Sequence, residues 1–206
     1  GLAGHGKIGV ANGIMGLYES SGEVTYKGKP LNIHSTYDVM KKRINFVSED
    51  RKHVGLILGN SIEQNIITPA PRVHKNYLKH YGLFTQLDRN AMREQAARMI
   101  EELRVKCTSP THPDGAHSGG NQQKIILARE MENHPELLVA VHPTRGLDIG
   151  ASQYVHDTMI EARDKGCGIL LISADFDEVL KLSDRILVMF EGQVMGIYSG
   201  EYPPVE

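Results

Sequence analysis

The sequence lacks the charge, cysteine and histidine patterns that mark nucleic-acid-binding, disulfide-rich and zinc-binding proteins. Its 206 residues carry a formal net charge of only −2, and no stripe of Lys and Arg indicates a nucleic-acid partner or a charged membrane-surface footprint. Two cysteines without a C-x-x-C pattern support neither a disulfide framework nor a zinc site. The ten histidines show no metal-ligand spacing. We therefore expect no metal site and no nucleic-acid partner.

Long apolar runs are also missing. The longest, such as 168–172, are far shorter than the roughly 20 residues that a membrane-spanning helix needs, and no signal peptide is visible. The chain lacks an initiator Met and opens inside a glycine-rich segment, so we expect it to be a piece of a longer protein. Its apolar content of 40% and charged content of 23% are those of an ordinary globular chain, which fits one domain over residues 1–206.

Apolar segments and helical patterns alternate in the C-terminal third. This alternation predicts an α/β fold with a mostly parallel sheet. The expected strands cover 44–47, 137–141, 168–173, 185–189 and 193–198, and a small hairpin covers 23–31. The expected helices cover 7–16, 37–43, 88–103, 119–133, 149–164 and 175–182. Residues 49–86 are mixed and polar, and the pattern assigns no element to them.

The glycine-rich opening carries the first chemical motif. Residues Gly1 to Lys7 match G-x-x-x-x-G-K, a loop whose backbone N–H groups hold phosphates at the start of a helix. Lys7 would reach the β- and γ-phosphates. The next position should offer a Ser or Thr hydroxyl to Mg²⁺, but Ile8 has no oxygen. An ordinary glycine turn remains an alternative for this segment alone.

Two further segments are suited to anion binding or to a polar turn. Ser118, Gly119 and Gly120 open a predicted helix, where free N–H groups and a hydroxyl can hold an anion. An ordinary helix cap by Ser118 is the alternative. The apolar strand 137–141 runs into the tight polar turn 142–148.

Together these segments resemble the ABC ATPase superfamily. The order of 118–124 and 143–148 is similar to that of the carbohydrate and nucleoside importers, whose ATPase subunit carries two such domains in one chain. Residues 49–56 and 172–185 resemble the second of those domains. The similarity extends over nearly the whole chain. It implies a P-loop NTPase fold with a RecA-like core, an inserted helical subdomain over 52–132 and a small antiparallel hairpin.

The resemblance also implies roles for individual residues. Glu49 takes the place of the glutamine that senses Mg²⁺ and the membrane subunit, and His142 that of the glutamate that polarises the attacking water, so these two are the catalytic candidates. ATP would be held by two sets, one in the phosphate loop and one facing the nucleotide of a partner domain. They are Gly1, Gly4, His5, Gly6, Lys7 and Ile8 in the first set, and Ser118, Gly119, Gly120, Gln122 and Asp148 in the second.

Three positions depart from the family pattern. Ile8 and Val141 stand where oxygens would hold or orient Mg²⁺, and Ala174 stands where many members carry a histidine. Losing one electrostatic contact of this kind costs ~10²–10³ in rate, so we expect weak or absent Mg²⁺ binding and poor hydrolysis at this site. His142 could act as a base, because the unperturbed pKa of histidine is near 6.5.

The serine-glycine motif at 118–120, by contrast, is intact. We therefore expect an asymmetric pair, in which this half binds ATP, hydrolyses it poorly and completes the site of a second nucleotide-binding domain. The implied partners are membrane permease subunits and a solute-binding protein, at the cytoplasmic face of the bacterial cell membrane. The solute stays open between a simple sugar and a nucleoside. A soluble ABC ATPase of repair or translation, and a regulatory nucleotide-binding module, remain alternatives.

Overall fold

The computed structural model describes residues 6–68, 70–106, 109–111 and 118–199. At its centre, β3 (Ile44–Val47), β6 (Leu137–Val141) and β7 (Gly168–Ile172) form a parallel sheet in the order β3-β6-β7. The predicted parallel sheet is therefore confirmed. Helix α7 (Ile149–Asp164) connects β6 to β7, the crossover that parallel neighbours require.

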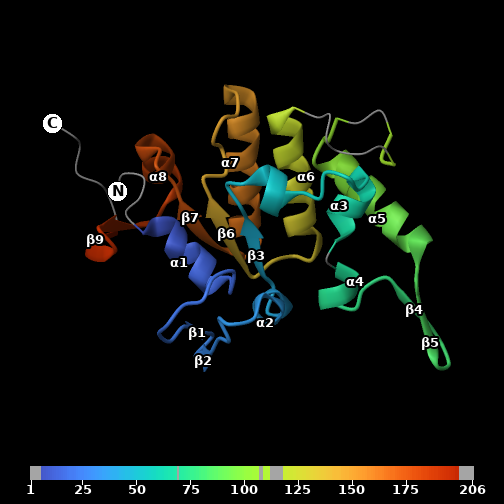
Figure 1. Ribbon diagram of the computed structural model, residues 1–206. Helices are drawn as coiled ribbons and strands as arrows, with labels where there is room; N and C mark the ends of the chain where they lie inside the picture. Colours follow the sequence, from blue (N-terminus) through green and yellow to red (C-terminus); the bar gives the residue numbers. More distant parts are fainter. Residues whose placement is uncertain (1–5, 69, 107–108, 112–117, 200–206) are drawn as a thin grey trace.

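The sheet lies between helices on its two faces (Figure 1), and apolar side chains fill both interfaces. Along β6, Leu138 and Ala140 pack toward α7 and α6 (Gly119–Glu132). Val139 and Val141 alternate to the other face, where α1 (Lys7–Ile14) and α2 (Thr36–Lys41) lie. A strand that is buried on both faces reads as a continuous apolar run, which is why β6 was predicted to the residue.

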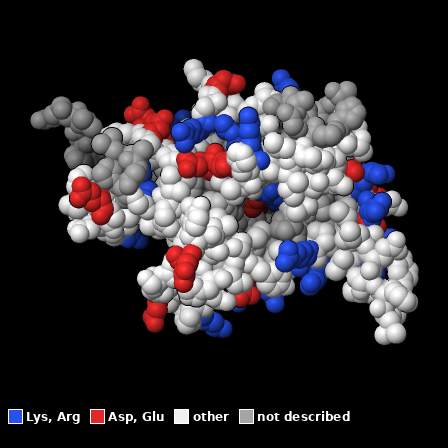
Figure 2. Space-filling model, viewed as in Figure 1, with Lys and Arg blue, Asp and Glu red and all other residues white. Residues whose placement is uncertain are grey.

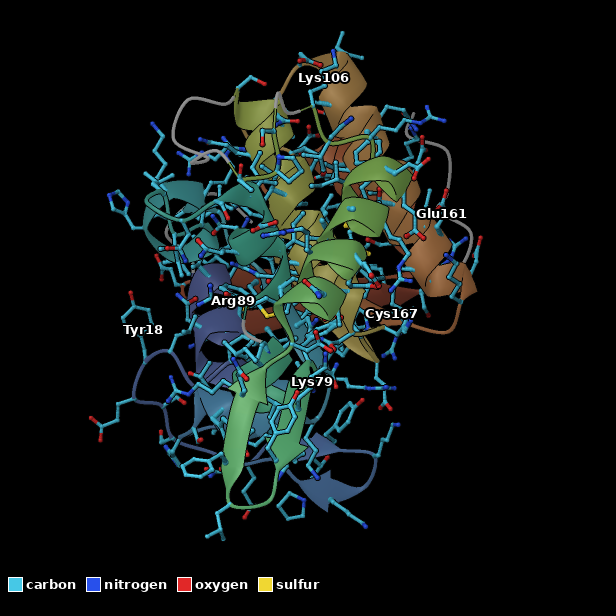
Figure 3. The ribbon with its side chains drawn as sticks, turned by 90° about the vertical axis from the view of Figure 1, so that its right-hand side faces the viewer. Tyr18, Lys79, Arg89, Lys106, Glu161 and Cys167 are labelled. Atoms are coloured by element: carbon cyan, nitrogen blue, oxygen red, sulfur yellow. The ribbon has the colours of Figure 1, made fainter. Side chains whose placement is uncertain are left out.

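The connection from β3 to β6 carries most of the remaining helices. It contains the short π-helix η1 (Arg51–Gly55), α3 (Ile62–Ile67), α4 (Ala70–Val73), the antiparallel hairpin of β4 (Leu78–Tyr81) and β5 (Phe84–Leu87), α5 (Arg89–Glu102) and α6. Helices α3, α5 and α6 share one apolar cluster with β6 and α7. The hairpin, on which Lys79 lies, extends away from this cluster (Figures 1 and 3).

Two other hairpins, unlike that of β4 and β5, were predicted from the sequence, and the structure confirms them. Strands β1 (Thr25–Tyr26) and β2 (Lys29–Pro30) pair around Lys27 and Gly28, whose positive φ values of 52° and 73° suit a tight two-residue turn. Strands β8 (Arg185–Phe190) and β9 (Gln193–Ser199) pair antiparallel, with α8 (Phe176–Leu182) before them. The central three-stranded sheet is parallel, whereas the separate two-stranded sheets of these hairpins are antiparallel.

Charge is dispersed over the surface shown in Figure 2, where Lys and Arg groups lie among Asp and Glu groups. Within the described ranges, no helix is both long and apolar enough to span a membrane. In the same ranges, no three His, Cys, Asp or Glu side chains are grouped so that they could hold a metal ion. Of the two cysteines, Cys167 is buried and free, its thiol pKa raised by burial, and Cys107 lies outside the described residues.

Candidate functional site

The carboxyl ends of the three parallel strands and the start of α1 meet at one edge of the sheet. We call this the strand-end edge and define it by Lys7, Glu49, His142, Ser173 and Ala174. Crevices at the carboxyl ends of strands in open α/β sheets are where such folds bind ligands. The edge brings together residues that are as far apart as 7 and 174 in the chain.

Gly6 and Lys7 begin α1. Gly6 is the N-terminal cap residue, with φ 86°, a left-handed conformation that glycine adopts without strain. Lys7 is the first helical residue, and its Nζ donates to the carbonyl oxygen of Ser173 over 3.2 Å. Partial burial lowers the pKa of Lys7. Gly1, Gly4 and His5 of the predicted loop lie outside the described residues.

The two positions that lack an oxygen are packed as apolar residues. Val141 is 1% exposed and belongs to the cluster of Ala11, Val139 and Ile172, and Ile8 packs against the same cluster. A hydroxyl or carboxylate at either place would enter apolar surroundings. These residues therefore do not fit a Mg²⁺ ion, whose ligands are oxygens.

His142 follows β6 with φ 45°, a left-handed conformation that is uncommon outside glycine and is found at functional sites. Its N–H donates to Ile172 O over 2.8 Å, and its Nδ1 accepts from the N–H of Ala174 over 3.3 Å. Burial lowers the pKa of His142, and the positive charges of Lys7 and Arg145 act in the same direction, while Glu49 opposes them. In the neutral ring with Nδ1 accepting, the proton is carried by Nε2.

Glu49 is held by a residue that the sequence did not single out for a role. Arg145 Nη1 lies 3.0 Å from Glu49 Oε2, with side chains 72% and 27% exposed. The pair joins the end of β3 to the turn after β6. Only the folded structure reveals it, because the two residues are 96 positions apart.

The serine-glycine motif begins α6. Ser118 is the N-cap, and its Oγ accepts from the N–H of Asn121 over 3.4 Å. Within the described contacts, Gly119 and Gly120 donate their N–H groups to no acceptor, as expected for the first turn of a helix. We call Ser118, Gly119 and Gly120 the signature end. Gln122, one turn further, is 5% exposed.

Arg51 and the turn after β6 lie beside the signature end. A Cβ built on Gly119 would lie 3.8 Å from Arg51 Nη2, and one built on Gly146 would lie 3.7 Å from the same atom. Burial and Arg145 lower the pKa of Arg51. Asp148 is exposed and caps α7 by accepting from Ala151 N–H over 2.8 Å. The second predicted set is thus gathered around the start of two helices.

A short π-helix, η1, begins close to Glu49, and Asp50 is its N-cap residue. Asp50 Oδ1 accepts from the N–H groups of Lys52 and His53 over 3.2 and 3.1 Å and caps η1. At the end of η1, a Cβ on Gly55 would lie 2.7 Å from Cδ1 of Ile126, so a larger residue would displace the end of the Ile126 side chain. Single π-helical turns are frequent at functional sites.

A cavity of about 530 Å³ lies along β7 between α7, α8 and β8, and Lys7, Ser173 and Ala174 of the strand-end edge are among its lining residues. Its walls are mainly apolar side chains, such as Met159, Leu171 and Val188. None of the signature end, His142 or Glu49 lines it. The cavity is therefore a mainly apolar gap beside the sheet.

Fold and site together define a class: an α/β nucleotide-binding domain with a helix start and a lysine at the strand ends. The family model for ABC transporters matches residues 1–145. The chain belongs to the ABC transporter family.

Several relatives of the chain are named as import ATP-binding proteins. The chain is 38% identical over 202 residues to the ribose import ATP-binding protein RbsA of Lacticaseibacillus paracasei, covering 98% of this chain and 39% of that protein. It is 37% identical over 202 residues to the nucleoside import ATP-binding protein NupA of Lactococcus lactis subsp. cremoris, with the same coverage. The guanosine import ATP-binding protein NupO of Bacillus subtilis is 36% identical over 196 residues, with 95% and 38% covered. The chain thus spans about two fifths of these relatives.

Solved structures share the fold. The ATP-binding cassette MJ0796, in a dimeric post-hydrolysis state bound to ADP and Pi, superposes with a TM-score of 0.77 at 22% identity, covering 96% of this chain and 82% of that chain. A nucleotide-free ATP-binding cassette from an ABC transporter gives a TM-score of 0.76 at 21% identity, with 97% and 78% covered. The predicted ABC ATPase fold is confirmed.

Proposed function

We propose that this chain is one nucleotide-binding half of the ATPase subunit of an importer for a simple sugar or a nucleoside. The observation that carries the proposal is the contrast between an intact signature end and a site whose two metal positions, Ile8 and Val141, offer no oxygen. The relatives named for ribose, nucleoside and guanosine import support the solute class.

At its own site, the chain binds ATP and hydrolyses it poorly. The backbone of the glycine loop, with Gly1, Gly4, His5 and Gly6, cradles the phosphates at the positive end of α1, and Lys7 exchanges its contact with Ser173 for a phosphate. Mg²⁺ is weakly held or absent, because Ile8 and Val141 are apolar. Without the metal, the charge that develops on the transferred phosphoryl group is poorly neutralised.

His142 and Glu49 keep positions next to the nucleotide with altered roles. The Nδ1 of His142 already accepts a hydrogen bond, so its Nε2–H serves as a donor to a phosphate oxygen rather than as a base. Glu49 is paired with Arg145, and it links the nucleotide to the helices between β3 and β6. Residues 52–132 form the subdomain that receives this signal.

The signature end serves the nucleotide of a second domain. The γ-phosphate of that nucleotide accepts hydrogen bonds from the Ser118 hydroxyl and from the backbone N–H groups of Gly119 and Gly120. These bonds stabilise its negative charge. Asp148, at the turn that meets the partner, completes that surface, and the buried Gln122 supports it from behind. The whole protein works with permease subunits and a solute-binding protein at the cytoplasmic face of the membrane.

Reconstitution of the full-length subunit with its membrane subunits tests this function. In proteoliposomes, the solute-binding protein loaded with a nucleoside or with ribose is expected to raise ATP hydrolysis several-fold over the unloaded protein. The matched control is the binding protein alone with the isolated ATPase subunit. An ATPase rate that ignores both the membrane subunits and the loaded binding protein would contradict the importer assignment.

A further inference from the structure

A buried carboxylate that the proposed chemistry does not use lies behind the turn after β6. Glu178 is the third residue of α8, and its side chain is 2% exposed, whereas the neighbouring Asp177 is exposed. A buried charge is costly unless it is hydrogen-bonded. Glu178 Oε1 accepts from Thr144 Oγ1 over 2.8 Å and lies 2.9 Å from His156 Nε2. An ionised carboxylate only accepts, so the His156 nitrogen donates.

These contacts join three elements at one oxygen. Thr144 belongs to the turn 142–148, His156 to α7 and Glu178 to α8. Oε2 of Glu178 has no partner in the described part of the chain, so Oε1 provides the whole attachment. Helix α8 follows Ala174, whose N–H binds His142. Glu178 therefore connects α8, which follows the strand-end edge in the chain, to the turn that carries Gly146 and Asp148.

Glu178 is a buried polar restraint on the position of that turn, in addition to the packing of Leu147 against the core cluster. The bonds Arg145 N–H to His142 O and Leu147 N–H to Thr144 O, both 3.1 Å, lie inside the turn and fix its shape but not its placement. The outer attachment, Arg145 to Glu49, has a 72% exposed arginine, and exposed ion pairs restrain little. A hydrogen bond to a buried charged acceptor is stronger than one between neutral groups.

We propose that Glu178 is a positioning residue for the turn 143–148: through Thr144, and with His156 as second donor, it holds the turn where the partner domain meets it. The role in the partner contact rests on the proposed function. Because α8 follows Ala174, the same contact couples the strand-end edge of this half to the interface with the other half.

The first test uses amide hydrogen exchange on the 206-residue chain without nucleotide. Thr144→Val keeps the shape and removes the hydroxyl, while Thr144→Ser keeps the hydroxyl. We expect Thr144→Val to speed exchange in 143–148 about 10-fold, the effect of losing one charge-assisted hydrogen bond, with exchange in β6 unchanged. Thr144→Ser should restore slow exchange. Glu178→Gln, with a neutral acceptor, should give a smaller increase, and the exposed control Asp177→Asn none.

The second test uses the two-domain subunit. Thr144→Val is expected to lower kcat for ATP about 10-fold with KM nearly unchanged, and Thr144→Ser to return it. Unchanged exchange in 143–148, or equal loosening of β6, overturns the positioning role. Faster exchange in 143–148 with an unchanged kcat overturns its coupling to the partner domain. A wild-type subunit without ATPase activity contradicts the proposed function instead, and the exchange experiment still decides whether Glu178 positions the turn.

Discussion

The strand-end edge and the signature end use their polar groups in opposite ways. At the strand-end edge, the side chains bind groups within the chain: Lys7 to Ser173 O, His142 to Ala174 N–H and Glu49 to Arg145. At the signature end, the N–H groups of Gly119 and Gly120 have no acceptor among the described residues. The first surface is hydrogen-bonded within the chain and has apolar residues at the metal positions, while the second keeps two backbone donors available in the described part of the chain. In the proposed function, this difference lets one half support catalysis in trans and lack it in cis.

The largest effect is expected at the signature end. Gly119→Asp has room for its Cβ, since the nearest atoms would be 3.8 Å away, but it places a negative charge where a phosphate would approach. We expect hydrolysis by the two-domain subunit to fall ~10²–10³-fold, as for loss of a main electrostatic contact in catalysis. Gly59→Asp, where a Cβ would meet nothing within 4 Å, is the control. Equal rates for the two variants would remove the distinction between the surfaces.

The second prediction concerns the metal position that is now apolar. Val141→Asp buries a carboxylate at a site that is 1% exposed. It should lower the free energy of unfolding by about 3 kcal/mol, typical of an unpaired buried charge, and it should not raise hydrolysis. Urea denaturation of the 206-residue chain measures the first effect. Val194→Asp, at a residue 56% exposed, is the matched control and should change stability little. A stable, more active Val141→Asp protein would show that the site still accepts Mg²⁺.

The fold was largely readable from the sequence, and its exceptions have physical causes. Strands β3, β6 and β7 are buried apolar runs, and α5 to α8 have helical patterns with capping residues such as Asp88 and Asp175. The hairpin of β4 and β5 was missed because nearly all its residues are exposed, which leaves no alternation between a buried and an exposed face. Helix α3 was missed because it is short and has a buried Asn65, which bonds the backbone of Ile57.

The candidate site was readable in part, for a related reason. The family resemblance and the predicted elements placed His142 and Ala174 after strands and Lys7 at the start of a helix, without any knowledge of contacts. The pairs Glu49–Arg145 and Thr144–Glu178 join residues 96 and 34 positions apart. Their pairing depends on how β3, β6 and α8 are arranged in space, and no local pattern in the sequence encodes it.

A smaller effect is expected from the pH dependence of stability. The pKa of His142 is lowered in the folded protein by burial, so the unfolded chain binds more protons below about pH 6.5. Stability should therefore fall as the pH is lowered from 7.5 to 5.5. This residue can contribute at most about 1.4 kcal/mol per pH unit. His142→Asn should flatten the curve, measured by urea denaturation at several pH values. It should not abolish the slope, because burial also lowers the pKa of His74. Identical slopes would mean that His142 is hydrated.

The smallest effect is expected from the exposed pair at the strand-end edge. Arg145→Ala removes the contact with Glu49, in which the arginine is 72% exposed. Such pairs contribute about 0–1 kcal/mol, so the thermal midpoint should hardly move. A large loss of stability on thermal unfolding would show that this pair, and not Glu178, fixes the turn after β6.

The central claim is that this half binds ATP and hydrolyses it poorly, while its signature end completes the other site. The most direct measurement counts the nucleotides retained by the two-domain subunit after a single turnover, with Lys7→Ala as the variant that weakens binding in this half. The account predicts one ATP and one ADP per wild-type subunit, with the ATP lost in Lys7→Ala and hydrolysis kept. Two ADP per wild-type subunit would contradict it.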